Sequence, residues 1–87
     1  MTHTLKALSD PARRKILELL KHQPLNAGQI HSHFHLSHAT ISHHLAVLKN
    51  AGLITAARTG TFITYELSTP FAEGLIEWLT EFTEIID

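Results

Sequence analysis

The sequence predicts a mainly helical α+β fold with about five helices and one β-hairpin. Two observations carry this prediction. Apolar residues recur at helical spacing through most of the chain, and helix-start signals, Asp10-Pro11 and Thr69-Pro70, precede two of these segments. Between residues 54 and 67 the spacing changes to every second residue around a glycine, which is typical of two strands joined by a tight turn.

Length and composition fit one globular domain, residues 1–87. The chain has 44% hydrophobic and 17% charged residues, which is ordinary for a folded protein, although 87 residues provide only a limited core. It contains no cysteine, which excludes disulfides and thiolate metal sites. We find no signal-peptide pattern and no apolar stretch long enough to span a membrane, and we therefore expect a cytoplasmic protein.

Two helices are predicted in the first quarter of the chain. Residues 3–8 form a short helix with Leu5 and Leu8 at i, i+3. A second helix begins at Asp10-Pro11 and runs to about His22. Its start is well specified, because Asp accepts a hydrogen bond from an amide at the helix end and Pro has no N–H that needs a partner there.

The third helix begins near Ala27. Asn26 and Gln29 have the spacing of a capping box, in which each side chain binds the backbone N–H of the other residue. The helix has room for about two turns, with Ile30 and Phe34 at i, i+4 facing inward.

A longer helix is predicted from about Ser37 to Asn50, with Ser37 as its N-cap and Gly52 just past its end. Its buried face carries residues at i, i+4 and i+7, namely Ile41, Leu45 and Leu48. Because a tight turn separates this helix from the previous one, the pair forms a helix-turn-helix at about residues 27–50.

The hairpin covers about residues 54–67, with its turn at Thr59-Gly60. The last helix covers about residues 70–86. One of its sides carries a wide apolar stripe, namely Phe71, Leu75, Trp78, Leu79, Phe82 and Ile86. A domain of this size has little core surface to cover the stripe. We therefore expect part of the stripe, together with Leu5 and Leu8, to face a second subunit. The alternative is simple packing on the domain's own core.

A helix-turn-helix followed by a hairpin is a winged helix-turn-helix, whose second helix fits the major groove of B-DNA. Double-stranded promoter or operator DNA is therefore the expected partner. Small and polar residues on this helix and at the hairpin tip can approach base edges and phosphates. The candidates are Ser37, His38, Ala39, Thr40, Ser42, His43 and Lys49 from the helix, and Arg58, Thr59 and Thr61 from the hairpin. The alternative is that they form only a solvent-exposed polar face.

Positive and negative charge are separated along the chain. All seven Lys and Arg residues lie in residues 1–68 with three acidic residues, so this part carries +4, whereas the five acidic residues after Ser68 give the tail −5. The asymmetry indicates separate tasks, with the acidic tail kept away from DNA. Arg58, with Arg13, Arg14 and Lys15 of the second helix, is expected to supply the positive field.

Three segments, Leu8–Leu17, Ile41–Leu48 and Ala51–Ile54, resemble the ArsR/SmtB family of bacterial repressors. The resemblance covers nearly the whole chain. It implies a winged-helix homodimer, formed through the first and last helices, that blocks transcription until an inducer or a protein partner releases it. Because a two-fold dimer reads two-fold DNA, we expect an inverted-repeat operator with half-sites about 10 base pairs apart, or a multiple of that.

Metal-sensing members of that family carry cysteines in the first helix of the motif or an Asp/His set on the last helix. The positions aligned with those cysteines hold residues such as Asn26, Gly28 and His31, and the last helix has no histidine. The resemblance is therefore to the short metal-independent, SdpR-like branch, and we expect neither a metal nor another cofactor.

A histidine-based, metal-responsive repressor is the alternative. His31, His33 and His35 lie close together, and imidazoles at i, i+4, such as His31 and His35 on one helical face, can bind Zn²⁺ or Ni²⁺. A structural site needs four ligands, however, and no cysteine or nearby carboxylate completes this one. Exposed histidines on a short helix are the simpler interpretation.

Three further histidines, His38, His43 and His44, lie in or beside the predicted reading helix. An imidazole gains a positive charge on mild acidification, and phosphates favour the charged form. We therefore hypothesise tighter DNA binding at lower pH. Equal operator affinities at pH 6 and pH 8, at fixed salt, would contradict this hypothesis.

Catalysis is not expected. Ser42 and His43 are the most suggestive pair, but adjacent helical residues point 100° apart, and the chain has no GxSxG, HExxH or phosphate-binding glycine loop. A winged helix used only for protein contacts remains an alternative, because the reading helix is weakly basic.

Overall fold

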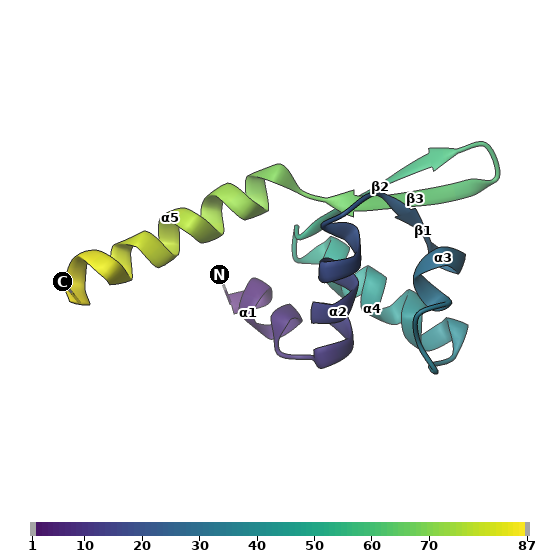
Figure 1. The fold of residues 1–87 in the computed structure, drawn as a ribbon, viewed down its shortest axis with the longest axis horizontal. Helices are drawn as coiled ribbons and strands as arrows, with labels where there is room; N and C mark the ends of the chain where they lie inside the picture. Colours follow the sequence, from purple (N-terminus) through teal and green to yellow (C-terminus); the bar gives the residue numbers. More distant parts are fainter. Residues whose placement is uncertain (1, 87) are drawn as a thin grey trace.

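The computed structural model describes residues 2–86, with the side chains of residues 72, 79 and 82–86 left out (Figure 1). The predicted mainly helical architecture is confirmed. In chain order the elements are α1 (Thr2–Leu8), α2 (Pro11–Leu20), β1 (Leu25–Asn26), α3 (Ala27–His31), α4 (His38–Asn50), β2 (Ile54–Thr59), β3 (Phe62–Leu67) and α5 (Thr69–Ile86).

The core lies between α2, α3, α4 and the base of the sheet. The predicted inward faces are confirmed for α3 and α4, where Ile30, Ile41 and Leu48 are at most 1% exposed. α1 contributes Ala7, which is fully buried, whereas Leu5 is 47% exposed. The buried hydrophobic residues are Ala7, Ile16, Leu20, Leu25, Ile30, Ile41, Leu45, Leu48, Leu53 and Ile54.

Helix caps confirm three predicted helix starts and one predicted end. The side chains of Asp10, Asn26 and Ser37 accept hydrogen bonds from backbone amides in the first turns of α2, α3 and α4. Asn26 and Gln29 form the predicted capping box, with distances of 2.8 and 2.9 Å. Gly52 follows α4 with a φ of +79°, a conformation that glycine adopts without steric cost.

The sheet has three antiparallel strands in the order β1-β3-β2. The hairpin is confirmed, but its turn is Gly60-Thr61, one residue later than predicted, because Thr59 still pairs with Phe62. Gly60 has a φ of +63°, which suits the first position of a two-residue hairpin turn. The sequence prediction missed β1, because a two-residue strand is too short to show an alternating pattern.

The prediction of two turns for α3 was wrong, because the helix ends at His31. Beyond it, tighter bonds such as Phe34 N–H to the His31 carbonyl (3.0 Å) replace the helical pattern. Lys15 of α2 donates to the His33 carbonyl (2.9 Å), and its ammonium lies 4.8 Å from the centre of the Phe34 ring. Phe34 is still partly buried against the core, so its predicted inward position is confirmed although it lies outside the helix.

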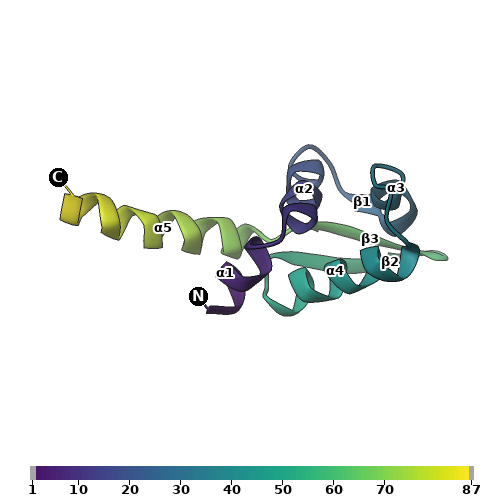
Figure 2. The same cartoon turned by 90° about the horizontal axis from the view of Figure 1, so that it is seen from below.

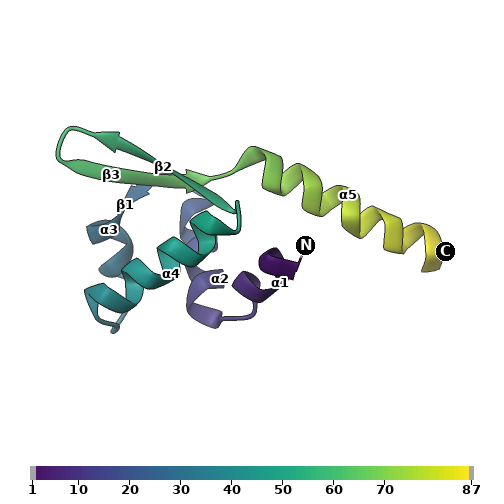
Figure 3. The same ribbon diagram turned by 180° about the vertical axis from the view of Figure 1, so that it is seen from behind.

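The long helix α5 leaves the domain as a projecting arm (Figures 1 and 3), which accounts for the elongated extents of 48 × 25 × 21 Å. At its start, Phe71 packs against the core. Farther along, Leu75 is half-buried and Ile76 is 65% exposed. Among the described stripe residues, Phe71 packs on the domain's own core, whereas Leu75 and Trp78 do not. No helix in residues 2–86 is long and apolar enough to cross a membrane.

Candidate nucleic-acid interface

The outward face of α4 carries most of the residues predicted to bind DNA. Its buried side faces α2 and the core, and the opposite side is exposed to solvent (Figure 2). The exposed residues on that side are His38, Ala39, Ser42, His43, Ala46, Lys49 and Asn50. Short side chains in the middle of this face allow close approach of a partner, while hydroxyl, imidazole and amide groups around them can hydrogen-bond to it.

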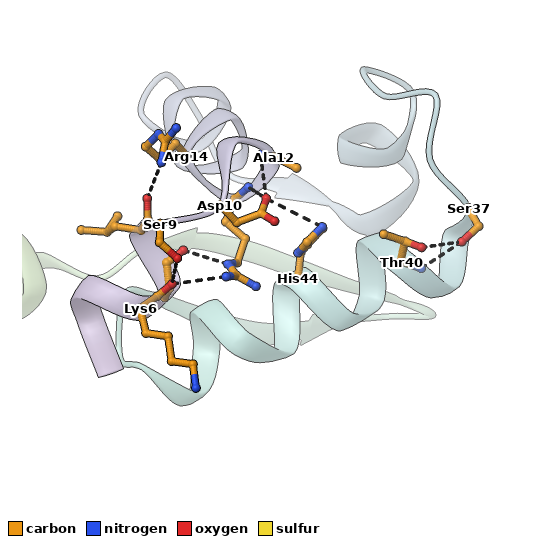
Figure 4. Close-up of polar contacts among 11 residues, drawn as sticks. Lys6, Ser9, Asp10, Ala12, Arg14, Ser37, Thr40 and His44 are labelled. Carbon is orange, nitrogen blue, oxygen red and sulfur yellow. Dashed lines mark hydrogen bonds and ion pairs between the residues drawn. The ribbon is translucent and has the colours of Figure 1, made fainter. Parts of the chain in front are cut away.

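Ser37 and Thr40 hold the start of α4 in place. The Thr40 amide donates to Ser37 Oγ (3.1 Å), and the two hydroxyl oxygens lie 2.8 Å apart (Figure 4). Thr40 is half-buried, whereas Ser37 is exposed. Both hydroxyls therefore serve the N-cap, in addition to the role in DNA contact predicted for them.

His44 belongs to the opposite side of α4 from the reading face. It is 8% exposed, and its Nε2 lies 4.0 Å from Asp10 Oδ1 at the start of α2 (Figure 4). Its Nδ1 is buried with no hydrogen-bond partner among the described residues. His44 thus lies within α4, as predicted, but its ring is buried against α2, and the hypothesis of pH-dependent binding now depends on His38 and His43.

Asp10 is the ionised partner at this contact. Partial burial opposes ionisation of its carboxyl, but hydrogen bonds from the Arg13 and Ala12 amides, together with the charges of His44 and Arg13, outweigh that effect and lower the pKa of Asp10 below its ordinary value. The amide distances are 3.2 Å for Arg13 and 2.8 Å for Ala12. Asp10 thus joins α2 to α4 and positions the reading helix.

The basic residues of α2 have structural partners that the sequence did not reveal. Arg13 donates from Nε to the Ala7 carbonyl (2.8 Å) and from Nη2 to the Lys6 carbonyl (3.3 Å). Arg14 donates to the Leu8 carbonyl (2.7 Å). The bonds to Ala7 and Leu8 satisfy carbonyls at the end of α1, where a helix leaves its last carbonyls without helical partners, while the Lys6 carbonyl also accepts from Ser9. Arg13 and Arg14 therefore anchor α1, in addition to the positive field expected from them.

The hairpin extends past the N-terminal end of α4 (Figure 2). Arg58, Thr59 and Thr61, the predicted contact residues, are all exposed near its tip. Sequence reasoning missed Phe62, which is 61% exposed directly opposite Thr59. The strand pattern suggested this residue, because Phe62 falls on the face that does not carry Tyr65 and Leu67.

A hollow of about 390 Å³ separates the hairpin from the helix-turn-helix. Ser42 lines it from α4, Gly28 from α3, and Phe62 and Ile63 from β3. The structure therefore brings Ser42 and the hairpin residues onto one continuous surface, although they lie about 20 residues apart in the chain.

The predicted metal pair does not lie on one helical face, because α3 ends at His31 and His35 follows in the turn. His31 instead stacks on His38 at the start of α4, with ring centroids 3.7 Å apart and an interplanar angle of 17°. The Nε2 atom of His31 lies 2.8 Å from the Leu36 carbonyl oxygen. No group of three or more His, Cys, Asp or Glu in the described part of the chain is placed to hold a metal ion.

The residues predicted to dimerise divide into three groups. Leu8 and Phe71 pack partly against their own core. Leu5, Leu75 and Trp78 are at least partly exposed on α1 and α5. The side chains of Leu79, Phe82 and Ile86 lie outside the described ones.

Residues 10–56 match the family model described as bacterial regulatory protein, arsR family. The chain belongs to the ArsR family. The matched segment runs from the N-cap of α2 to the start of the hairpin, and so contains the complete helix-turn-helix.

Two ArsR-type relatives are similar along most of the chain. The chain is 48% identical to the transcriptional repressor SdpR of Bacillus subtilis, over 94% of this chain and 91% of that protein. It is 39% identical to the arsenical resistance operon repressor of Staphylococcus xylosus, over 79% of this chain and 66% of that protein.

Solved ArsR structures have the same fold. A homodimeric winged helix-turn-helix DNA-binding domain from Mycobacterium bovis, solved by NMR, matches with a TM-score of 0.77 at 26% identity, over 95% of this chain and 77% of that one. A crystal structure of another ArsR family regulator matches with a TM-score of 0.90 at 24% identity, over 97% and 92% of the two chains, which shows the fold alone. The predicted winged helix-turn-helix class is thus confirmed.

Proposed function

We propose that this ArsR family protein is a transcriptional repressor that binds operator DNA as a homodimer. The observation that carries the proposal is the exposed face of α4, where small residues lie among hydroxyl and imidazole groups and the hairpin flanks them. A helix of this size fits the major groove, and side chains of these kinds bind base edges and phosphates. The repressors and the homodimeric DNA-binding domain among its relatives support the same assignment.

The whole chain acts in this proposal as one domain with three working parts. Residues 27–50 read DNA, residues 54–67 contact the backbone or the minor groove, and the helix at about 70–86 joins two subunits. Ser37, His38, Ala39, Thr40, Ser42, His43 and Lys49 contribute from the first part, and Arg58, Thr59 and Thr61 from the second. Such a protein regulates without catalysing a reaction, and in a bacterium it works in the cytoplasm, where the chromosome lies.

A mobility-shift assay tests the proposal. The wild-type protein is titrated against promoter DNA of its own gene and against unrelated DNA of the same length, at fixed salt. We expect the promoter to bind at least about 1,000-fold more tightly, which is the lower end of the range for specific regulators. Equal and weak binding to both DNAs would contradict the proposal and favour a winged helix that serves protein contacts.

A further inference from the structure

The structure contains a second hollow, of about 470 Å³, between α1 and the C-terminal half of α4. Lys6 and Arg13 line it together with two histidines, His3 from α1 and His43 from α4, and with Asn50 of α4. The other lining residues are small or apolar, and no acidic residue is among the described residues that line it. The hollow therefore combines two fixed positive charges with two imidazoles that can donate hydrogen bonds.

The two fixed charges differ in how they are held. Arg13 is partly buried, and its bonds to the Lys6 and Ala7 carbonyls fix the guanidinium plane. Lys6 is exposed, and no carboxylate among the described residues lies within ion-pair distance of its ammonium. Asp10, the nearest acidic residue in the sequence, does not line the hollow and is directed to amides of α2 and to His44. Such a site suits an anion, with Lys6 as the adjustable contact.

The position of the hollow indicates which anion it receives. His43 and Asn50 belong both to the hollow and to the exposed face of α4, so the two surfaces are continuous. α1 lies beside the C-terminal half of α4, while the hairpin tip with Arg58 extends past its N-terminal end (Figure 2). A duplex lying along α4 thus meets positive charge at both ends of the helix.

We infer that the hollow between α1 and α4 is a phosphate site for the DNA backbone, with Lys6 as its main contact and His3 and His43 as supporting donors. The inference rests on the proposed function. It makes α1 part of the DNA interface in addition to the dimerisation role predicted for Leu5. Phosphate contacts of this kind fix the position of a protein on the duplex without reading sequence.

Lys6→Gln tests the site, with Lys21→Gln as the matched control. Lys21 is the C-cap residue of α2, does not line the hollow and carries the same charge. It is exposed, and its ammonium lies 3.9 Å from the equally exposed carboxylate of Glu18. We expect Lys6→Gln to weaken binding to operator and to unrelated DNA alike, by about three- to tenfold at low salt, and to reduce the slope of log affinity against log salt by about one. Lys6→Arg should restore the slope, and Lys21→Gln should leave it unchanged.

Four outcomes would overturn the inference, and each is distinguishable. Equal effects of Lys6→Gln and Lys21→Gln would mean that only net charge matters. A changed dimer content of Lys6→Gln in sedimentation would place Lys6 in the subunit interface. The hollow would be a small-anion site if the free protein bound inorganic phosphate at micromolar concentration and Lys6→Gln abolished that binding but left DNA affinity unaffected. If Lys6→Gln changed the sequence preference, Lys6 would contact a base and not a phosphate.

Failure of the proposed function looks different, because the wild-type protein itself would then fail to bind its promoter.

Discussion

At the scale of single residues, the contact between Asp10 and His44 shows how a helix start is linked to the reading helix. Asp10 caps α2 with two amide bonds and also faces the buried ring of His44 on α4. The cap was predictable from Asp10-Pro11, because a carboxylate before proline is a local signal. The contact with His44 was not, because helical spacing puts position 44 on the buried side of α4 but does not show that Asp10 of α2 lies opposite it.

Asp10→Ala should lower the free energy of unfolding by about 1 kcal/mol at pH 7, because the first amides of α2 lose their acceptor. Asp10→Asn should cost less, since Asn also caps a helix but carries no charge. The lowered pKa of Asp10 fixes the sign of the pH effect: the charge stabilises the fold above the ordinary pKa of 3.8, and this contribution is lost as pH falls through the folded pKa.

Urea denaturation of the three proteins between pH 7 and pH 2 measures this effect. The difference between the wild type and Asp10→Asn should shrink toward zero at the acid end. A difference that stays constant over the whole range would show that the Asp10 charge contributes nothing, and that its hydrogen bonds alone matter.

At the scale of elements, the helices that were well predicted are those whose signals are local. α4 has a capping serine, a regular apolar face and a terminal glycine, so its bounds follow from the sequence. α3 was overestimated because Phe34 continues its apolar spacing, while the bonds that end it come from the turn and from Lys15 on another helix. Arg13 and Arg14 were misjudged for the same reason, because their acceptors are set by the turn between α1 and α2.

The reading helix and the hairpin should respond differently to substitution. Ser42→Ala should weaken binding to the operator by about 1 kcal/mol while leaving unrelated DNA unaffected, because Ser42 is proposed to contact base edges. His43→Ala should weaken binding to the operator by a similar amount, and should also weaken binding to unrelated DNA through the phosphate contact proposed for it. Arg58→Ala should weaken binding to both DNAs and reduce the salt slope by about one, because Arg58 meets the backbone. Titrations of both DNAs at several salt concentrations measure the two effects, and a change in sequence preference alone for Arg58→Ala would contradict its assignment.

At the scale of the whole molecule, the arm formed by α5 explains why so short a chain carries so wide an apolar stripe. Among the side chains of α5 that the structure describes, Phe71 is the one packed against the domain core, so the rest of the stripe needs another surface. In the proposed homodimer a second copy of the chain would provide one, and the two-fold symmetry of such a pair would place two α4 helices on one side of the duplex. The stripe was predictable from helical spacing, but the direction in which α5 leaves the domain was not, because it depends on the chain path after β3.

Leu75→Glu should therefore convert the dimer to a monomer without unfolding it. Leu75 is half-buried on α5 and lies outside the core, so a charge there should disturb the subunit contact rather than the domain. Glu77→Gln, an exposed position on the same helix, is the matched control and should stay dimeric. Sedimentation at micromolar concentration measures the subunit state, and circular dichroism checks that helix content is kept.

DNA binding by the same variant tests whether the dimer serves the operator. A dimer joins two reading helices, so after one helix has bound a half-site the other binds its half-site at high effective concentration. Loss of the dimer should therefore weaken binding to an inverted repeat by on the order of 100-fold. Binding to a single half-site should change little. The wild type should bind no more tightly than Leu75→Glu when the spacing between the half-sites is changed by about 5 base pairs, since this turns one half-site to the opposite side of the duplex. A monomeric wild type would contradict the dimer itself, whereas a Leu75→Glu dimer with full affinity would place the subunit contact elsewhere on the chain.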